Sequence, residues 1–126
     1  MSASIHDAIR VFYPGQDKPD LTTFADKITF QLNDTHPVIG IPELMRVLMD
    51  EYGYDWDTAW TVTNKTFNYT CHTLLPEALE VWPSKLIGEL LPRHLEIIEK
   101  IQDQFAAELK AKASTKPASR TWPSTP

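Results

Sequence analysis

The stretch that most constrains the fold runs from Lys27 to Pro37, and its pattern predicts a strand, then a polar corner, then a proline that ends the strand pairing. Apolar and polar side chains alternate from Lys27 to Leu32, which predicts a strand with one buried face. Residues 33–36 are all polar, and Pro37 then prevents a return to the sheet because proline has no amide hydrogen to donate. Open α/β sheets place ligand sites at the carboxyl ends of their strands. The corner is therefore the first candidate for function.

Within the corner, Asp34 and His36 flank Thr35, so both side chains can project to one side of an extended or turning backbone. One interpretation is an acid and a pH-sensitive imidazole that converge on a ligand. The other is an Asx turn, in which Asp34 caps a following backbone amide and His36 packs against it. Spacing alone slightly favours the turn and leaves both interpretations open.

Most of the remaining chain shows apolar residues at helical spacing. One expected helix carries Trp56, Trp60 and Phe67 on one side, a stripe typical of a core. The expected helices are residues 4–13 with Ser4 as N-cap, Pro42 to about Tyr52 with Gly53 as the stop, Trp56 to about Tyr69 with Asp55 as N-cap, 77–81, 85–91 with Ser84 as N-cap, and Pro92 to about Lys112.

A count of these elements leaves one convincing strand, whose backbone groups would be unpaired on both edges. We expect its partner strands to come from sequence outside this chain. The strand, the ligand-type corner and the following helix are typical of a parallel, doubly wound sheet. The predicted fold class is therefore α/β, mostly helical, with one parallel-type strand in this segment.

Composition excludes several classes of function. The net charge of −5 argues against a protein that binds nucleic acid through the phosphate backbone. The N-terminus lacks the features of a signal peptide, and no apolar run is long enough to cross a bilayer. The single cysteine, Cys71, excludes an internal disulfide framework. We expect a cytoplasmic protein without nucleic-acid or membrane partners.

A second polar cluster consists of Cys71, His72 and Thr73. A thiol nucleophile beside an imidazole is one interpretation, but neighbours in sequence rarely face each other in space. A zinc site that joins this cluster to Asp34 and His36 lacks the usual ligand spacing. We therefore predict no metal site.

Five motifs stand in register between about Ile5 and Lys112: QLNDTHP (31–37), IPELMR (41–46), KTFNYT (65–70), HTLLPEALE (72–80) and LPRHLEII (91–98). Together they resemble the glycogen and starch phosphorylases. The resemblance implies part of a large two-domain glycosyltransferase of the GT-B (Rossmann-like) type. Such enzymes release terminal α-1,4-linked glucose as glucose 1-phosphate, with retention of configuration. Residues 1–113 are then expected to be a partial N-terminal domain, and 114–126 a disordered tail rich in Ser, Thr and Pro.

The resemblance also implies roles for individual residues. His72 is expected to contact the bound glucose and Thr73 to line the same pocket, while Asp34 and His36 lie beside the sugar. The chain departs from the family pattern at Cys71, where Asn is usual, and at Val81, where Arg is usual. We expect no complete catalytic set in this chain.

The family's cofactor is pyridoxal phosphate, held by a lysine of the C-terminal domain, and no lysine here lies in a similar motif. The implied partners are α-glucan, phosphate and a second subunit, since family members are usually homodimers. The chain alone is expected to be inactive. The alternative is a non-catalytic module that binds glucan or docks on a phosphorylase through exposed aromatic side chains.

Overall fold

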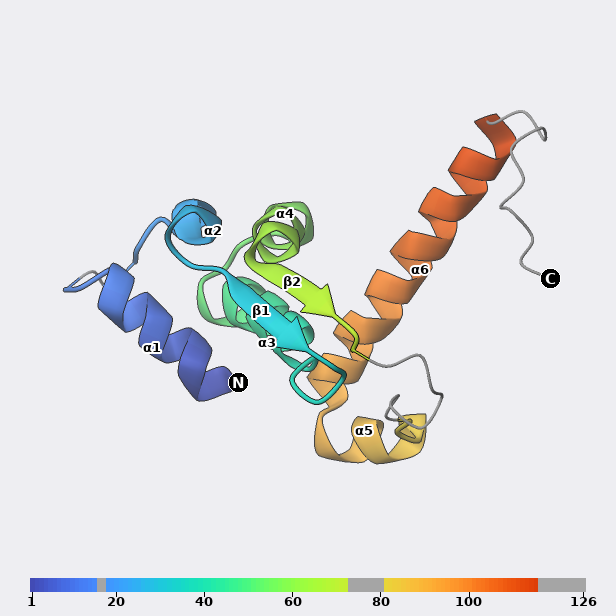
Figure 1. Ribbon diagram of the computed structural model, residues 1–126, viewed down its shortest axis with the longest axis horizontal. Coiled ribbons are helices and arrows are strands. Elements are labelled where there is room, and N and C mark those ends of the chain that lie inside the picture. The colour runs from blue at the N-terminus through green and yellow to red at the C-terminus, as the bar shows by residue number, and fades with distance from the viewer. Residues whose placement is uncertain (16–17, 73–80, 116–126) are drawn as a thin grey trace.

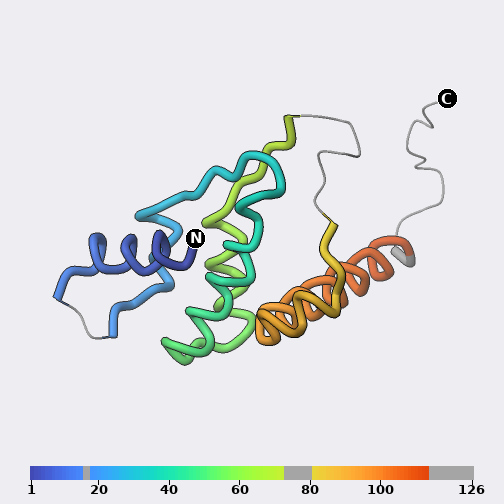
Figure 2. Tube along the Cα trace, turned by 90° about the horizontal axis from the view of Figure 1, so that it is seen from below, coloured from blue at the N-terminus to red at the C-terminus, as the bar shows by residue number. Residues whose placement is uncertain are grey.

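The computed structural model describes residues 1–15, 18–72 and 81–115. In this part of the chain, short helices pack around a small parallel sheet, and one long helix extends away from them (Figure 1, Figure 2). The elements in chain order are α1 (Ser2–Phe12), η1 (Leu21–Thr23), α2 (Phe24–Lys27), β1 (Phe30–Asn33), α3 (Gly40–Arg46), η2 (Val47–Glu51), α4 (Trp56–Thr66), β2 (Phe67–Thr70), α5 (Ser84–Leu90) and α6 (Pro92–Thr115).

The sheet contains a strand that was not predicted. Residues 67–70, expected to end a helix, form β2 and pair in parallel with β1, so that Phe30 lies opposite Phe67 and Asn33 opposite Thr70. The two phenylalanine rings stack with their centroids 5.3 Å apart. Aromatic and β-branched residues favour the extended backbone here, and pairing satisfies one edge of β1. The expectations of a single strand and of a helix reaching Tyr69 are therefore wrong.

The first strand is shifted along the chain relative to the prediction. β1 begins at Phe30 because Lys27 closes the short helix α2, where the amide of Ile28 donates to the carbonyl of Phe24 at 3.0 Å. The predicted alternation is nevertheless present, since Leu32 is buried between exposed neighbours. β1 also continues to residue 33, so the first residue of the polar corner belongs to the strand.

Two predicted helix boundaries near the middle of the chain are confirmed. Asp55 is the N-cap of α4, and its carboxylate accepts a hydrogen bond of 3.3 Å from the amide of Thr58. Gly53 adopts φ 75°, a left-handed conformation that glycine takes without steric cost, directly after the π-helical turn η2. The stop at Gly53 and the helix start at Asp55 therefore lie where the sequence predicts.

Two other predicted caps are wrong. Ser4 lies inside α1, which begins at Ser2, and Ser84 is the first residue of α5 rather than its N-cap. The reason is that the carbonyls of Met1 and Pro83 already accept the first helical hydrogen bonds, at 3.1 and 3.0 Å. Neither helix has a side-chain cap at its start.

The core is formed by the facing sides of α1, α3, η2 and α4, together with the segment 21–24. Trp56, Trp60 and Phe67 pack against it but stay partly exposed. Its fully or almost fully buried apolar residues are Ile5, Ala8, Ile9, Tyr13, Leu21, Phe24, Leu44, Met45, Val47, Leu48, Ala59, Val62 and Ile97.

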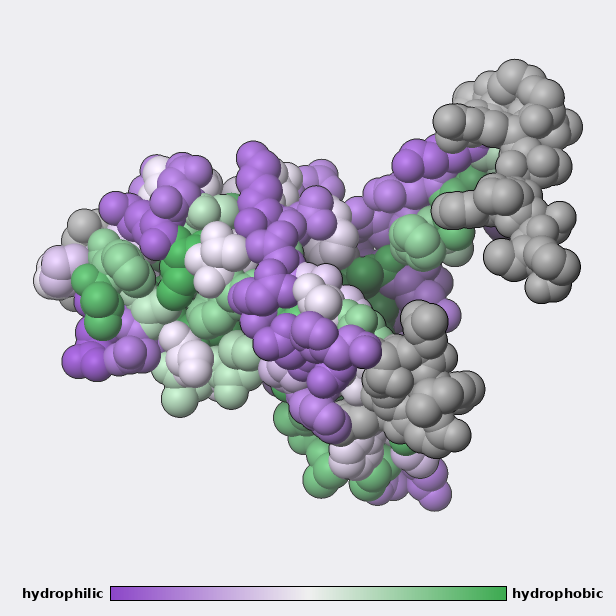
Figure 3. Space-filling view, viewed as in Figure 1, coloured by the Kyte–Doolittle hydropathy of each residue, from purple (hydrophilic) through white to green (hydrophobic). Residues whose placement is uncertain are grey.

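The long helix α6 reaches this core mainly through Ile97, which is 1% exposed. Further along, Phe105 and Leu109 are 60% and 51% exposed, so the second half of the predicted apolar face lies on the surface, as Figure 3 shows. The helix runs to Thr115 instead of ending near Lys112. Residues 116–126 and 77–80 lie outside the described residues. Among the described helices, none combines the length and the apolar character that crossing a membrane requires.

Candidate functional site

The corner after β1 is built on a left-handed residue. Asp34 has φ 61°, and its amide donates to the carbonyl of Thr70 at 2.9 Å, which extends the pairing of the two strands by one bond. Asp and Asn tolerate this conformation better than other residues with a Cβ atom. The chain then turns through residues 35–38, where the amide of Val38 donates to the carbonyl of Thr35 at 3.2 Å. The ends of both strands consequently meet at Asp34.

His72 arrives at the same point from β2. Its amide donates to the Asp34 carboxylate at 3.4 Å, and its ring Nε2 lies 3.1 Å from Oδ1 of Asn33. Since an amide oxygen only accepts, this hydrogen bond places the ring proton on Nε2. Two candidate residues distant in sequence, Asp34 and His72, are thus brought together at the sheet edge.

Sequence reasoning did not select Asn33 as a site residue. A signal for it exists, because Gln31 and Asn33 are two apart in a strand and therefore share one face. On that face Gln31 donates to the hydroxyl of Thr70 at 2.9 Å, and Asn33 meets His72. The polar face of the two strands therefore supports the side chains of the corner.

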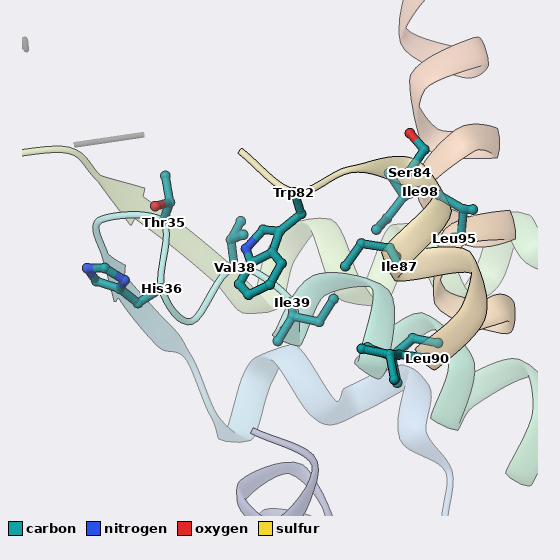
Figure 4. A pocket seen from close by; sticks show the side chains of 11 residues that line it. Thr35, His36, Val38, Ile39, Trp82, Ser84, Ile87, Leu90, Leu95 and Ile98 are labelled. Carbon is teal, nitrogen blue, oxygen red and sulfur yellow. The ribbon is translucent and has the colours of Figure 1, made fainter. Parts of the chain in front are cut away.

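The other candidates lie elsewhere. His36 is exposed on the turn beyond Asp34, and in Figure 4 its ring lies apart from the apolar side chains at the other end of the cavity. Thr73 lies outside the described residues. Cys71 is exposed, and the Nε2 atom of the neighbouring His72 contacts Asn33. Among the described residues, no three His, Cys, Asp or Glu side chains are grouped closely enough to hold a metal ion.

The hydroxyl of Tyr69, the residue before the last one of β2, is influenced by Cys71 and Asp34. Desolvation, a hydrogen bond with the Cys71 thiol and the negative charge of Asp34 raise the pKa of Tyr69. A pKa above the ordinary value keeps the Tyr69 hydroxyl neutral at pH 7, and the residue is 46% exposed at the edge of the site. It adds a further polar group next to Asp34.

Beside the corner lies a cavity of about 520 Å³ between the turn and helices α5 and α6. Trp82 lies between the turn residues and the aliphatic side chains of the helices (Figure 4). Apolar cavities of this size bury apolar groups well, whereas sugars need several polar partners. Of the polar lining residues, Thr35 and His36 lie at the corner end, and Ser84 lies at the start of α5. The lining residues are Thr35, His36, Val38, Ile39, Trp82, Ser84, Ile87, Leu90, Leu91, Leu95 and Ile98.

Pyridoxal phosphate needs a lysine that can reach it in a sheltered site. Every lysine of the described residues is exposed and none lines the cavity, so the described residues do not fit this cofactor. These lysines are Lys18, Lys27, Lys65, Lys85, Lys100, Lys110 and Lys112.

Comparison with known proteins identifies the family. Residues 1–122 match the carbohydrate phosphorylases. Glycogen phosphorylase of Synechocystis sp. is 49% identical over 112 residues, which cover 89% of this chain and 13% of the relative. The alpha-glucan phosphorylase H isozyme of Vicia faba is 53% identical over 107 residues, covering 84% and 13%. The muscle form of glycogen phosphorylase from Mus musculus is 49% identical over 117 residues, covering 88% and 14%.

The chain thus spans about 13% of the length of the curated relatives it matches. Relatives from a cyanobacterium, a plant and an animal share close to half of its residues. By this match the chain belongs to the carbohydrate phosphorylase family.

Proposed function

We propose that this chain supplies one wall of a glucose site of an α-1,4-glucan phosphorylase, an enzyme that releases glucose 1-phosphate from glycogen or starch with retention. The observation that carries the proposal is the approach of His72 to Asp34 and Asn33, with bonds of 3.4 and 3.1 Å, in a chain that belongs to this family. Polar groups that converge at a strand end match the hydroxyl-rich surface of a sugar.

Each site residue has a distinct part in this proposal. The Nε2–H of His72 donates to a sugar hydroxyl when it leaves Asn33, and the Asp34 carboxylate accepts from a neighbouring hydroxyl. His36 and Thr73 complete the same wall. Gln31 and Thr70 hold the sheet face behind it through their side-chain bond of 2.9 Å.

The proposed domain assignment follows from the family. Residues 1–113 form part of the N-terminal domain of a GT-B fold. The parallel pairing of β1 and β2 supports this, because doubly wound Rossmann-like domains are built on parallel strands. The helices α3 and α4 then make the crossover between two strands of a larger sheet.

The isolated chain is proposed to be inactive. Phosphorylases use pyridoxal phosphate, whose phosphate group assists the attack of inorganic phosphate. The described lysines are exposed, and none lines the corner cavity. The proposed partners are therefore α-glucan, phosphate and the remaining parts of a homodimeric enzyme. A cytoplasmic location is proposed, supported by a relative in Arabidopsis thaliana whose name contains "cytosolic".

The proposal is tested with the full 126-residue chain. Glucose and maltotriose, added at millimolar concentrations, are expected to shift the amide NMR signals of Asn33, Asp34 and His72. The variants His72→Gln and Asp34→Asn should reduce these shifts at least fivefold. Lys110→Gln, which changes an exposed side chain on the outer part of α6, should leave them unchanged. Shifts spread evenly over the chain, or none at the corner, would contradict a sugar wall.

A second measurement addresses activity. The chain, mixed with glycogen, phosphate and pyridoxal phosphate, is expected to form no glucose 1-phosphate in a coupled assay. A full-length phosphorylase in the same assay is the positive control. Turnover by the chain alone would show that the inactive-segment proposal is wrong.

The alternative function is a non-catalytic module that binds glucan or docks on a complete phosphorylase. It is favoured by the exposed apolar side chains of Trp82, Leu90 and Phe105, which are 58%, 67% and 60% exposed. Affinity electrophoresis in glycogen-containing gels and co-purification with a full-length phosphorylase test it. Normal mobility together with no co-purification would exclude this alternative.

A further inference from the structure

A network of charged side chains joins α1 to the rest of the molecule, away from the corner. His6 of α1 contacts Glu51 of η2, with Nε2 at 3.0 Å from Oε1. Arg46 of α3 bonds both Glu51, at 3.0 Å, and Glu43, at 2.5 Å. His94 of α6 reaches the same Glu43 at 3.3 Å. A single chain of ion pairs therefore connects α1, α3, η2 and α6.

The two ring nitrogens of His6 both face acceptors. Nδ1 lies 2.8 Å from the carbonyl oxygen of Ser2, and Nε2 lies 3.0 and 3.1 Å from the two carboxylate oxygens of Glu51. The Ser2 hydroxyl is farther from Nδ1, at 3.4 Å. Carbonyl and carboxylate oxygens only accept hydrogen bonds, so each ring nitrogen must carry a proton for both bonds to form. This geometry requires the imidazolium form of His6.

The charged groups around His6 favour that form. The hydrogen bond to Glu51 and then the bond to the Ser2 carbonyl raise the pKa of His6, with smaller contributions from the charges of Glu51 and Glu43, while desolvation opposes them. Arg46, the cation that faces the same carboxylates, bonds the Oε2 oxygen of Glu51, which His6 also contacts. The two cations thus share one carboxylate, which couples the protonation of α1 to the position of α3.

We propose that His6 is a proton-operated clasp, which holds α1 against α3 and η2 when its ring is doubly protonated and loosens α1 when the ring is neutral. Loss of the Nε2 proton removes the bond to Glu51 across the interface. Loss of the Nδ1 proton removes the bond to Ser2 and also the positive charge that attracts the Glu51 carboxylate, so either neutral form weakens the interface. A folded-state pKa above the ordinary 6.5 means that this stabilisation is complete below about pH 6.5 and is lost as the pH rises through the folded-state value.

Met1, next to the first residue of α1, connects this contact to the start of α3, the helix that follows the corner. A Cβ atom on Gly40 would lie 2.5 Å from Cγ of Met1, so the methionine side chain fills the space that only a glycine leaves open. Gly40 is the first residue of α3, directly after the turn that carries His36. Release of α1 therefore withdraws the side chain that packs behind the start of α3.

The first test is an NMR titration of the histidine rings in the full chain. The midpoint of His6 is expected above 6.5 and should fall toward 6.5 in Glu51→Gln, which keeps the shape of the partner but removes its charge. Ring nitrogen shifts below the midpoint should be those of an imidazolium with both protons. A midpoint at or below 6.5, or no change in Glu51→Gln, overturns the proposal.

The second test follows α1 itself by amide hydrogen exchange between pH 6 and pH 8.5. Exchange in α1, divided by that in α4 to remove the intrinsic effect of pH, should rise at least threefold across the His6 midpoint. His6→Gln should remove this dependence, while Arg10→Gln, which breaks only the exposed pair with Asp7, should retain it. A flat ratio in the unaltered chain, or four histidines that titrate together as in an unfolded chain, contradicts the clasp.

Discussion

The amide of Asp34 donates to the carbonyl of Thr70 at 2.9 Å, although α3, η2 and α4 lie between the two residues in the chain. This bond carries the parallel pairing past the last residue of β1 and into the left-handed turn. The strained backbone is thus supported by the strand that also brings His72 to the site. The pairing of the two strands therefore both supports the left-handed backbone of Asp34 and positions His72 beside it.

The left-handed conformation at residue 34 predicts a graded response to substitution. Asp34→Asn should change the free energy of unfolding by less than about 0.5 kcal/mol, because asparagine also tolerates positive φ. Asp34→Val should lower it by about 1–2 kcal/mol or more, because a β-branched side chain is strained there. Urea unfolding followed by circular dichroism measures both. Equal stability of the two variants would show that the conformation at residue 34 is not maintained in solution.

Two buried threonines on α4 predict opposite responses to the same change. Among the described residues, the hydroxyl of Thr63 is buried without a hydrogen-bond partner, while that of Thr66 donates to the Val62 carbonyl at 2.7 Å. Thr63→Val should stabilise the fold by about 1 kcal/mol, because it removes an unsatisfied polar group. Thr66→Val should be neutral or destabilising by up to about 1 kcal/mol. Thermal unfolding of the two variants provides the comparison, and a destabilised Thr63→Val would argue against the buried hydroxyl.

The attachment of α6 predicts a position-dependent effect along one helix. Ile97→Ala should lower the free energy of unfolding by about 2–4 kcal/mol, because Ile97 is buried and its removal leaves a cavity. Leu109→Ala, at a 51% exposed position, should change it by less than about 0.5 kcal/mol. Urea unfolding of the two variants measures both changes in the free energy of unfolding. Similar losses at both positions would mean that the outer half of α6 is packed in solution.

Acid is expected to release α6 before the rest of the fold. Burial opposes the charge of Glu43, but bonds from Arg46, Ser2 and His94 lower its pKa, and the bond to Arg93 lowers the pKa of Asp50. Their stabilising contribution is therefore present above the ordinary values of 4.5 and 3.8 and is lost as the pH falls through the lower folded-state values.

The measurement is helix content and amide exchange in α6 between pH 5 and pH 2. Arg93→Gln, which removes the pair that holds Asp50 at 2.9 Å, should shift the release of α6 to higher pH. Lys110→Gln changes a charge on the exposed part of the same helix and should not. Release of α1 before α6 at low pH would contradict this order.

Sequence patterns predicted the fold where the signal was local. The Asp55 cap, the Gly53 stop and the polar corner depend on a few neighbouring residues, and each is present in the structure. β2 was missed because Phe67 continues the helical spacing of Trp56 and Trp60, and its pairing with Phe30 depends on residues far away in the chain. Tertiary pairing here overrides local periodicity.

The candidate site was predictable in part for the same reason. Asp34 and His36 stood out as polar residues after a strand, and His72 was selected through the family motif. Their relative positions were not accessible, because the approach of His72 to Asn33 requires the parallel register that only β2 provides. The charge network around His6 joins side chains up to 51 residues apart, beyond the reach of any local pattern.

The parallel arrangement of β1 and β2 also has a kinetic consequence. Phe30 can meet Phe67 only after the chain between them has folded back, since parallel neighbours require a long crossover. Closing such a loop costs entropy before the strand bonds compensate for it. We therefore expect α3 and α4 to associate first and the corner to form among the last parts of the molecule, so that folding rate depends on the helix contacts and not on the strands.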